Sequence, residues 1–367
     1  MSDSASTKPS FPVLDQLRAW AALAVFTHHF FQQYAAHVPG DALRSLLNHL
    51  GPWGVSVFFV MSGFCIHSGS IHRPGGVSSL VPRDYALRRF FRIYPALALC
   101  VLLSCLLGHV LSANLLPPAG PLDVVAHLTL LSHFSATQRD AVNNVLWSVV
   151  AECYFYGLYG LMFRQFKGLR QTAVTTAMAI AVAALTYLAS VVLLPAGPQR
   201  VLVQNLFLAS WWTWCLGALV AELVHRPSTA RLSPRLAQLA LGLSLAVSLS
   251  IGWLPGSLGL QAQRFLLPIT SAVLLYLVLV VTKPRQRGGK LVSIGLASYS
   301  LYLFHPIAIA LVLQAGLGLW ASAALTLPLG LMLAYLGHRW IEQPGVAWGK
   351  ALGQRLRHPK APMPKPA

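Results

Sequence analysis

The residue types that can do chemistry in this chain are an acid and a histidine on two apolar segments far apart in the sequence. Only nine acidic residues occur among the 367, and one of them, Glu152, lies inside an apolar stretch. A carboxyl group in hydrocarbon costs about 3 kcal/mol or more, so an intramembrane acid is a functional-site hypothesis by default. His29 follows Arg18 by about three helical turns, which places both on one helix face. His28 is expected to point elsewhere.

His29 and Glu152 can form a pair that transfers protons. On a helix, His29 should stand about 16 Å deeper than Arg18, and Glu152 about 14 Å below the outer start of its segment. Both then reach a similar depth near the bilayer centre, where a neutral imidazole can accept a proton. The alternative is that each is a satisfied polar residue that joins two helices. Both interpretations stay open from the sequence.

Further polar side chains accompany this pair at helical spacing. Ser148 and Tyr156 lie four residues to either side of Glu152, a stripe that suits the wall of a hydrated cavity. His305 shares a face with Tyr302 and can line the pocket or be structural. The residues expected around the pocket are Asp15, Trp147, Ser148, Tyr156, Tyr302 and His305.

Three clustered arginines form a second candidate site at the start of another apolar segment. Arg88, Arg89 and Arg92 fall on one side of a helix, and clustered guanidinium groups suit bidentate binding of phosphates. The alternative is an anchor that contacts anionic lipid headgroups. A phosphate-rich cofactor from the cytoplasm would favour the first interpretation. Far along the chain, Glu342 is expected at the cytoplasmic surface in a salt bridge with a neighbouring arginine.

Transmembrane helices must position these residues. With 56 % hydrophobic and 10 % charged residues, the chain has too little polar material for a soluble globule and is expected to be an integral membrane protein. About 20 apolar residues cross the hydrocarbon layer as a helix. Ten such segments are predicted, at 14–33, 52–70, 92–112, 143–163, 171–194, 203–224, 237–254, 264–282, 291–316 and 319–338. A shorter apolar stretch, 122–134, carries His127 and His133 and predicts an interfacial helix.

The basic residues predict the orientation of this all-α bundle. With the N-terminus in the cytoplasm, 23 of the 27 lysines and arginines fall on the inside, as the positive-inside bias requires. Both termini are then cytoplasmic, and the net charge of +18 reflects topology rather than nucleic-acid binding. The chain divides into a cytoplasmic N-terminal segment (1–13), a ten-helix membrane domain (14–345) and a basic, proline-rich cytoplasmic tail (346–367). The five cysteines lack metal-type spacing and are expected to be packing residues, with no metal site.

Six motifs in matching order resemble the acyltransferase family 3 membrane proteins. They are Leu14-Asp15-x-Leu-Arg18 with His29, Gly54-Val-x-x-Phe58-Phe59-x-x-Ser62-Gly63-Phe64, Arg89-x-x-Arg92-Ile-x-Pro95, Trp147-Ser148-x-x-x-Glu152, Ser298-Tyr-Ser-Leu-Tyr302-x-x-His305-Pro306 and Glu342-x-Pro344. The resemblance covers residues 14 to about 345. The chain departs from the family pattern at Gln16, where glycine is frequent, and at Val149 and Val150, where leucine is more usual.

The resemblance implies an enzyme that takes an acyl group, most often acetyl, from cytoplasmic acyl-coenzyme A. The acceptor would be a hydroxyl of a carbohydrate or glycoconjugate, and the enzyme would lie in a bacterial inner membrane. His29 would be the essential histidine, Arg18 would complete its motif, and Arg89 and Arg92 would lie near the coenzyme phosphates. The competing function is a proton-coupled transporter or flippase, because buried His and Glu residues also serve proton coupling. No two-fold internal repeat supports that alternative.

Overall fold

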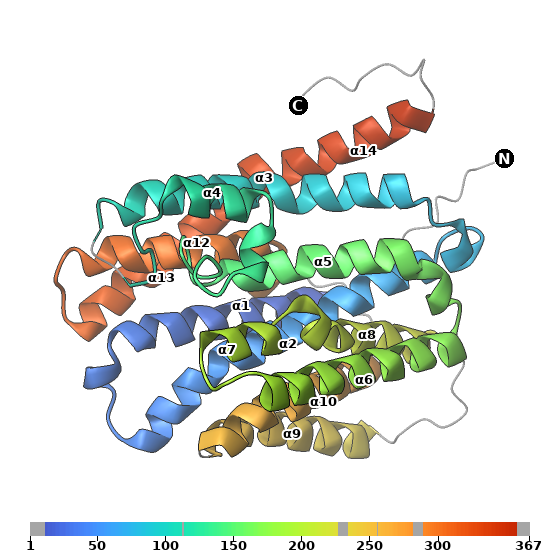
Figure 1. Ribbon diagram of the computed structural model, residues 1–367, viewed down its shortest axis with the longest axis horizontal. Coiled ribbons are helices and arrows are strands. Elements are labelled where there is room, and N and C mark those ends of the chain that lie inside the picture. Colours follow the sequence, from blue (N-terminus) through green and yellow to red (C-terminus); the bar gives the residue numbers. More distant parts are fainter. Residues whose placement is uncertain (1–11, 112–113, 227–233, 255, 282–288, 358–367) are drawn as a thin grey trace.

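The computed structural model describes residues 12–111, 114–226, 234–254, 256–281 and 289–357, and helices dominate these residues (Figure 1). The longer helices are α1 (Pro12–Gln33), α2 (Asp41–Ile71), α3 (Pro82–Gly108), α5 (Leu146–Met162), α6 (Leu169–Leu193), α8 (Phe207–Val224), α9 (Pro234–Ser250), α10 (Gly256–Val281), α12 (Ser298–Leu313), α13 (Leu319–Gly337) and α14 (Gln343–Arg357). The short ones are α4 (Pro121–Leu128), α7 (Pro198–Gln204) and α11 (Lys290–Leu296). No strand occurs in the described residues, so the all-α prediction is confirmed.

Length and composition identify the helices that can cross a membrane. Seven helices of the described residues qualify, or eight if the bent pair α11 and α12, which meet at 83°, is one broken span. Eight of the ten predicted segments are thus matched, and the polytopic membrane bundle is confirmed. The other two segments are also helical. The segment at 237–254 contains a shorter apolar helix, and the segment at 14–33 lies within α1, which carries the polar residues Asp15, Arg18, His28 and His29. Polar side chains lower the hydropathy of such a segment.

Several boundaries differ from the prediction. Helix α2 starts at Asp41 and continues through Pro52, and α3 starts at Pro82. Proline fits the first helical turn because it needs no hydrogen-bonded N–H there, which explains the start of α3. The earlier start places all three clustered arginines inside the helix. The stretch at 122–134 forms two short helices, α4 and the 3-10 turn Leu131–Phe134, and Leu130 with φ 65° separates them.

The predicted tail is helical at its start. Residues 346–357 belong to α14, which packs against α3, because a π-helical turn (His338–Glu342) carries the chain directly from α13 into α14. The remaining tail residues, 358–367, and the first eleven residues lie outside the described residues. The cytoplasmic location of both termini stays a prediction.

Helix α2 is the central element of the bundle. It packs against α1, α8 and α10, while α3, α5 and α12 lie on the other side of α1 and α2 (Figure 1). The contact with α8 depends on glycine, since a Cβ atom on Gly63 would clash with the carbonyl oxygen of Trp214, and one on Gly217 with that of Val60. Small residues let the backbones of two membrane helices approach closely. This packing fixes which faces of α2 remain free to line cavities.

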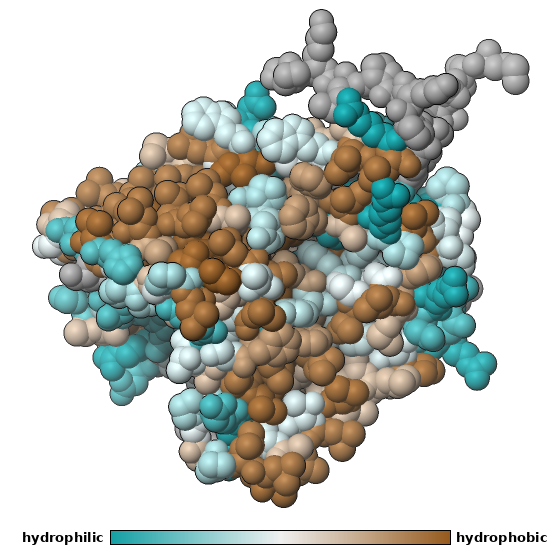
Figure 2. All heavy atoms as spheres, turned by 45° about the horizontal axis from the view of Figure 1, so that its top comes forward, coloured by the Kyte–Doolittle hydropathy of each residue, from teal (hydrophilic) through white to brown (hydrophobic). Residues whose placement is uncertain are grey.

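The outside of the bundle is apolar. Large side chains such as Leu185, Leu188 and Val192 on α6 are exposed, and in Figure 2 brown apolar side chains spread over the middle of the face while teal ones gather toward its left and right ends. An apolar band between polar ends matches hydrocarbon between two headgroup layers. The buried polar residues of the interior therefore face other helices or cavities rather than lipid.

Candidate active site

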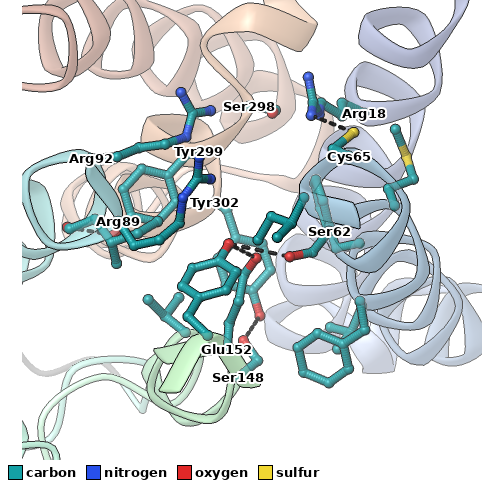
Figure 3. Close-up of a pocket in the computed structure, with 18 residues that line it drawn as sticks. Arg18, Ser62, Cys65, Arg89, Arg92, Ser148, Glu152, Ser298, Tyr299 and Tyr302 are labelled. Carbon is teal, nitrogen blue, oxygen red and sulfur yellow. Dashed lines mark hydrogen bonds between the residues drawn. The ribbon is translucent and has the colours of Figure 1, made fainter. Parts of the chain in front are cut away.

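Most of the predicted site residues meet in one cavity of about 300 Å³ between α1, α2, α3, α5 and α12, which we call the arginine cavity (Figure 3). It is lined by Arg18, Val55, Phe58, Phe59, Met61, Ser62, Cys65, Ile66, Arg89, Arg92, Ile93, Ser148, Val149, Glu152, Tyr156, Ser298, Tyr299 and Tyr302. Arg89 and Arg92 approach from one side and Arg18 from the other. Three guanidinium groups face a single acid, Glu152, so the cavity suits a ligand with several negative charges.

A chain of hydroxyl groups holds the acid of this cavity. The Tyr156 hydroxyl donates to the Glu152 carboxylate, and the Ser62 hydroxyl donates to Tyr156 at 3.2 Å. Nearby, the hydroxyl groups of Ser148 and Tyr302 lie 2.6 Å apart. Polar groups in a low-dielectric site are costly unless they are hydrogen-bonded, and this network partners them. Glu152 is thus positioned by its own helix and by α2.

The arginines are also held by neighbours. Arg18 donates to the Asp15 carboxylate at 2.8 Å and to the Cys65 sulfur at 3.2 Å. The Arg89 guanidinium lies 5.8 Å from the centroid of the Tyr156 ring, within cation–π range. Asp15 does not line the cavity and instead orients Arg18. Cys65, expected to be a packing residue, lies in the cavity wall.

His29 lies in a second cavity, of about 540 Å³, which we call the histidine cavity. It is lined by His28, His29, Gly51, Pro52, Val55, Ser56, Phe59, Asn144, Val145, Trp147, Tyr187, Val201, Gln204, Asn205, Ala209, Ser210, Trp212, Thr213, Leu260, Gln261, Gln263, Arg264, Pro268 and Tyr302. Amides, hydroxyl groups and aromatic rings dominate its polar lining, and none of these lining residues is an Asp or Glu. Such a surface suits a polyhydroxylated ligand, whose hydroxyl groups pair with amides.

Hydrogen bonds fix the tautomer of His29. Nδ1 of His305 lies 2.8 Å from the Tyr302 carbonyl oxygen, and because a carbonyl only accepts, this nitrogen carries the proton. Nε2 of neutral His305 is then an acceptor. Nδ1 of His29 lies 3.1 Å from that Nε2 and 3.0 Å from the Val25 carbonyl oxygen, so it is protonated too. The lone pair of neutral His29 is therefore on Nε2, the nitrogen that a general base needs free.

The structure does not bring His29 and Glu152 together. Each lines its own cavity, and Val55, Phe59 and Tyr302 line both, so these three residues form the wall between them. The partner that orients His29 is His305, which was expected in the pocket but is 1 % exposed and lines neither cavity. Depth along a helix is readable from sequence, whereas the face that meets a neighbour depends on packing.

Other predicted residues divide between the two cavities. Ser148 and Tyr156 line the arginine cavity, Tyr302 lines both, and Trp147 lines the histidine cavity. The Arg139 guanidinium, which lines neither cavity, lies 4.5 Å from the Trp147 ring centroid. Arg88 lines neither. This differs from the prediction because the third arginine of the cavity is Arg18, from α1.

His28 and Glu342 also differ from expectation. His28 lines the histidine cavity beside His29, because Gly51 lacks the Cβ atom that would collide with its ring. Glu342 is 2 % exposed and accepts hydrogen bonds from the Ser300 backbone N–H at 3.0 Å and hydroxyl at 2.5 Å. It therefore caps the start of α12 instead of forming a surface salt bridge with arginine.

Sequence reasoning missed the polar residues of the histidine cavity, among them Asn144 and Arg264. Each lies among other polar residues at the start of a predicted apolar segment, where polar residues are ordinary. Arg264 carried one available signal, since it is one of only four basic residues that the predicted topology places outside.

A helical membrane bundle that holds a basic cavity beside an imidazole with a free Nε2 has the parts of a membrane-embedded group-transfer enzyme. The family model described as "Acyltransferase domain" matches residues 11–339, and the chain belongs to this family, acyltransferase family 3. The chain is thus an integral membrane protein of an acyltransferase family, and membership of this family favours an enzyme over the transporter alternative.

Two curated relatives are similar to parts of the chain. "Acyltransferase MdmB" of Streptomyces mycarofaciens is 27 % identical over 269 residues, which cover 72 % of this chain and 57 % of that protein. "Putative peptidoglycan O-acetyltransferase YrhL" of Bacillus subtilis (strain 168) is 30 % identical over 155 residues, 40 % of this chain and 22 % of that protein. The matches thus span about half and about a fifth of these relatives. No solved structure is significantly similar to the chain.

Proposed function

We propose that this protein moves an acyl group, acetyl in the first instance, from cytoplasmic acyl-coenzyme A to a hydroxyl group of a carbohydrate or glycoconjugate at a bacterial inner membrane. The observation that carries the proposal is the tautomer of His29, which leaves Nε2 unprotonated in a polar cavity directly behind the wall of the arginine cavity. The relative named as a putative peptidoglycan O-acetyltransferase supports a glycan acceptor and an acetyl group.

The arginine cavity is the proposed donor site. Arg18, Arg89 and Arg92 present three guanidinium groups, and coenzyme A carries phosphates that guanidinium groups bind bidentately. The cavity is too small for the whole coenzyme, so the phosphates stay at the arginines while the narrow pantetheine arm carries the thioester inward. The shared wall of Val55, Phe59 and Tyr302 is where the thioester would meet the acceptor.

The histidine cavity is the proposed acceptor site. Nε2 of His29 takes the proton from the acceptor hydroxyl as its oxygen attacks the thioester carbonyl, and a carbon–oxygen bond forms. The carbon–sulfur bond then breaks, and the thiolate of coenzyme A leaves with the proton from the imidazolium. His305 holds the ring through Nδ1 during both steps. Because a thioester is already activated, the protein mainly supplies alignment and proton transfer.

His29→Ala tests this proposal. Protein in sealed vesicles is supplied with labelled acetyl-coenzyme A and surface glycans from cells that lack the protein, and acylated glycan is measured by mass spectrometry. Loss of a general base lowers the rate by about 10²- to 10⁴-fold, whereas binding of coenzyme A should persist, since His29 does not line the arginine cavity.

His28→Ala is the matched control, because His28 lines the same cavity as His29. The two differ in the partner of Nδ1: that of His28 lies 3.1 Å from the Leu47 carbonyl oxygen, whereas that of His29 also contacts the His305 imidazole. We expect its rate to fall by less than about tenfold. Near-normal transfer by His29→Ala would remove the proposed mechanism, and glycan without acyl groups in every sample would remove the proposed acceptor class.

A further inference from the structure

Arg264 is a charged residue of the histidine cavity that the proposed reaction does not use. It comes from α10, and its guanidinium lies 5.2 Å from the centroid of the Tyr187 ring. Its Nη1 atom is buried and has no hydrogen-bond partner among the described residues. A buried donor without a partner is costly, so a native site that keeps one calls for a ligand group to fill the position.

A second residue of the same cavity lining also has a buried atom without a partner. Oδ1 of Asn144 is buried and has no hydrogen-bond partner among the described residues. It accepts, whereas Nη1 of Arg264 donates, so the lining residues of this cavity hold one unpaired atom of each kind. A carbohydrate hydroxyl can donate to the asparagine, but a cationic donor is best matched by an anion.

The charge of the cavity points the same way. Its lining holds Arg264 together with His28 and His29 but none of the protein's acids, so nothing there neutralises the guanidinium. Arginine binds carboxylate and phosphate oxygens with two parallel hydrogen bonds, and it does so more strongly when water is excluded. Aromatic rings from Trp147, Tyr187 and Trp212 supply the flat surfaces on which a sugar ring packs.

We infer that the acceptor is an anionic carbohydrate, and that Arg264 binds its carboxylate or phosphate group while His29 takes the proton from the hydroxyl that becomes acylated. The inference rests on the proposed function for the role of His29. It adds the chemical class of the acceptor and assigns a specificity-determining residue.

Binding of three small probes tests the inference without any need for catalysis. Methyl β-glucuronide carries a carboxylate, glucose 1-phosphate carries a phosphate, and methyl β-glucoside is neutral. Their affinities for the purified full-length protein, without acyl-coenzyme A, are measured by ligand-observed NMR in neutral detergent. A charge-assisted hydrogen bond corresponds to about a ten- to a hundredfold preference for the better-fitting anionic probe over the neutral one. Which anionic probe binds more tightly distinguishes carboxylate from phosphate.

Arg264→Gln should abolish the preference, and Arg264→Lys, which keeps the charge, should retain part of it. Arg44→Gln is the matched control, because it removes a cation near the start of α2 that is paired with Asp41 at 3.2 Å and lines neither cavity. Thermal unfolding confirms that each variant is folded. Equal or undetectable binding of all three probes, or a preference that survives in Arg264→Gln, would overturn the inference.

Failure of the role of Arg264 can be distinguished from failure of the proposed acyl transfer. His29→Ala should keep the preference for anionic probes while it loses acyl transfer. A protein that transfers acyl groups to neutral glycans without discrimination would contradict the role of Arg264 and leave the role of His29 intact.

Discussion

The guanidinium groups and the imidazole occupy separate positions in this site. Arg18 is fixed by Asp15 and Cys65, whereas Arg89 and Arg92 extend from α3 into the same cavity, and His29 lies beyond the wall. The proposed function thus assigns the binding of a phosphate-rich donor and the proton transfer to different side chains. Substitutions in the two groups should therefore affect different kinetic constants.

Arg92→Gln should raise the KM for acyl-coenzyme A about tenfold, because one charge-assisted hydrogen bond contributes roughly 1.5 kcal/mol. The kcat should change much less, since the guanidinium lies away from His29. Steady-state release of free coenzyme A at several donor concentrations measures both constants. Arg88→Gln is the control from the same helix, because Arg88 does not line the cavity. Equal effects of the two substitutions would mean that only the general charge of α3 matters.

The sequence indicated most of the polar and charged residues of the arginine cavity, and those on α5 share a helical face. Ser148, Glu152 and Tyr156 recur every four residues on α5, and such spacing puts side chains on one face whatever the helix packs against. Contacts between helices depend instead on which faces meet. The pairing of His29 with His305 follows from how α1 crosses α12, and no pattern within either segment contains that angle.

At the scale of elements, a short irregular segment packs beside α5, the helix that carries Glu152. The turn Leu131–Phe134 follows the left-handed residue Leu130 and packs against α5, placing His133 near the rings of Tyr154 and Phe207. The stretch was predicted as one interfacial helix from its apolar length alone. Composition alone did not reveal the break at Leu130, because positive φ at a leucine is stabilised only by surrounding contacts.

His133 should make the protein less stable in acid. Burial, followed by the charge of Arg139, lowers the pKa of His133 to about 4 from 6.5. The unfolded chain therefore binds more protons between these values, so stability is complete above about pH 6.5 and is lost as the pH falls toward 4. The loss amounts to roughly 3 kcal/mol, at about 1.4 kcal/mol per pH unit.

His133→Phe keeps an aromatic ring among aromatic neighbours and removes the titrating group. Thermal unfolding in neutral detergent between pH 7.5 and 4.5 should show a smaller decrease in midpoint temperature for this variant than for the unsubstituted protein. His37→Phe, at an exposed position, should leave the decrease unchanged. An identical pH response of His133→Phe and the unsubstituted protein would contradict the assignment.

At the scale of the whole molecule, the two cavities lie on opposite sides of one shared wall, formed by Val55, Phe59 and Tyr302. The arginine cavity lies toward the starts of α1 and α3, and the histidine cavity includes His29 near the end of α1 and residues of α7 and the first half of α10. Composition and charge predicted a polytopic helical bundle, but not two cavities, because cavities arise where packed helices fail to fill space. The predicted topology places the arginine cavity on the cytoplasmic side.

Cys65 can report this sidedness, because its half-buried thiol lines the arginine cavity and accepts from Arg18. The membrane-impermeant anion sulfonatoethyl methanethiosulfonate should modify it in inside-out vesicles and not in right-side-out vesicles. Coenzyme A should slow the modification, since the reagent enters the same basic cavity that we propose as the donor site. Cys65→Ser should remove this protected fraction of the label, which separates it from the other four cysteines. Modification from the opposite face, or labelling at an unchanged rate with saturating coenzyme A, would mean that the donor does not enter between Arg18 and α3.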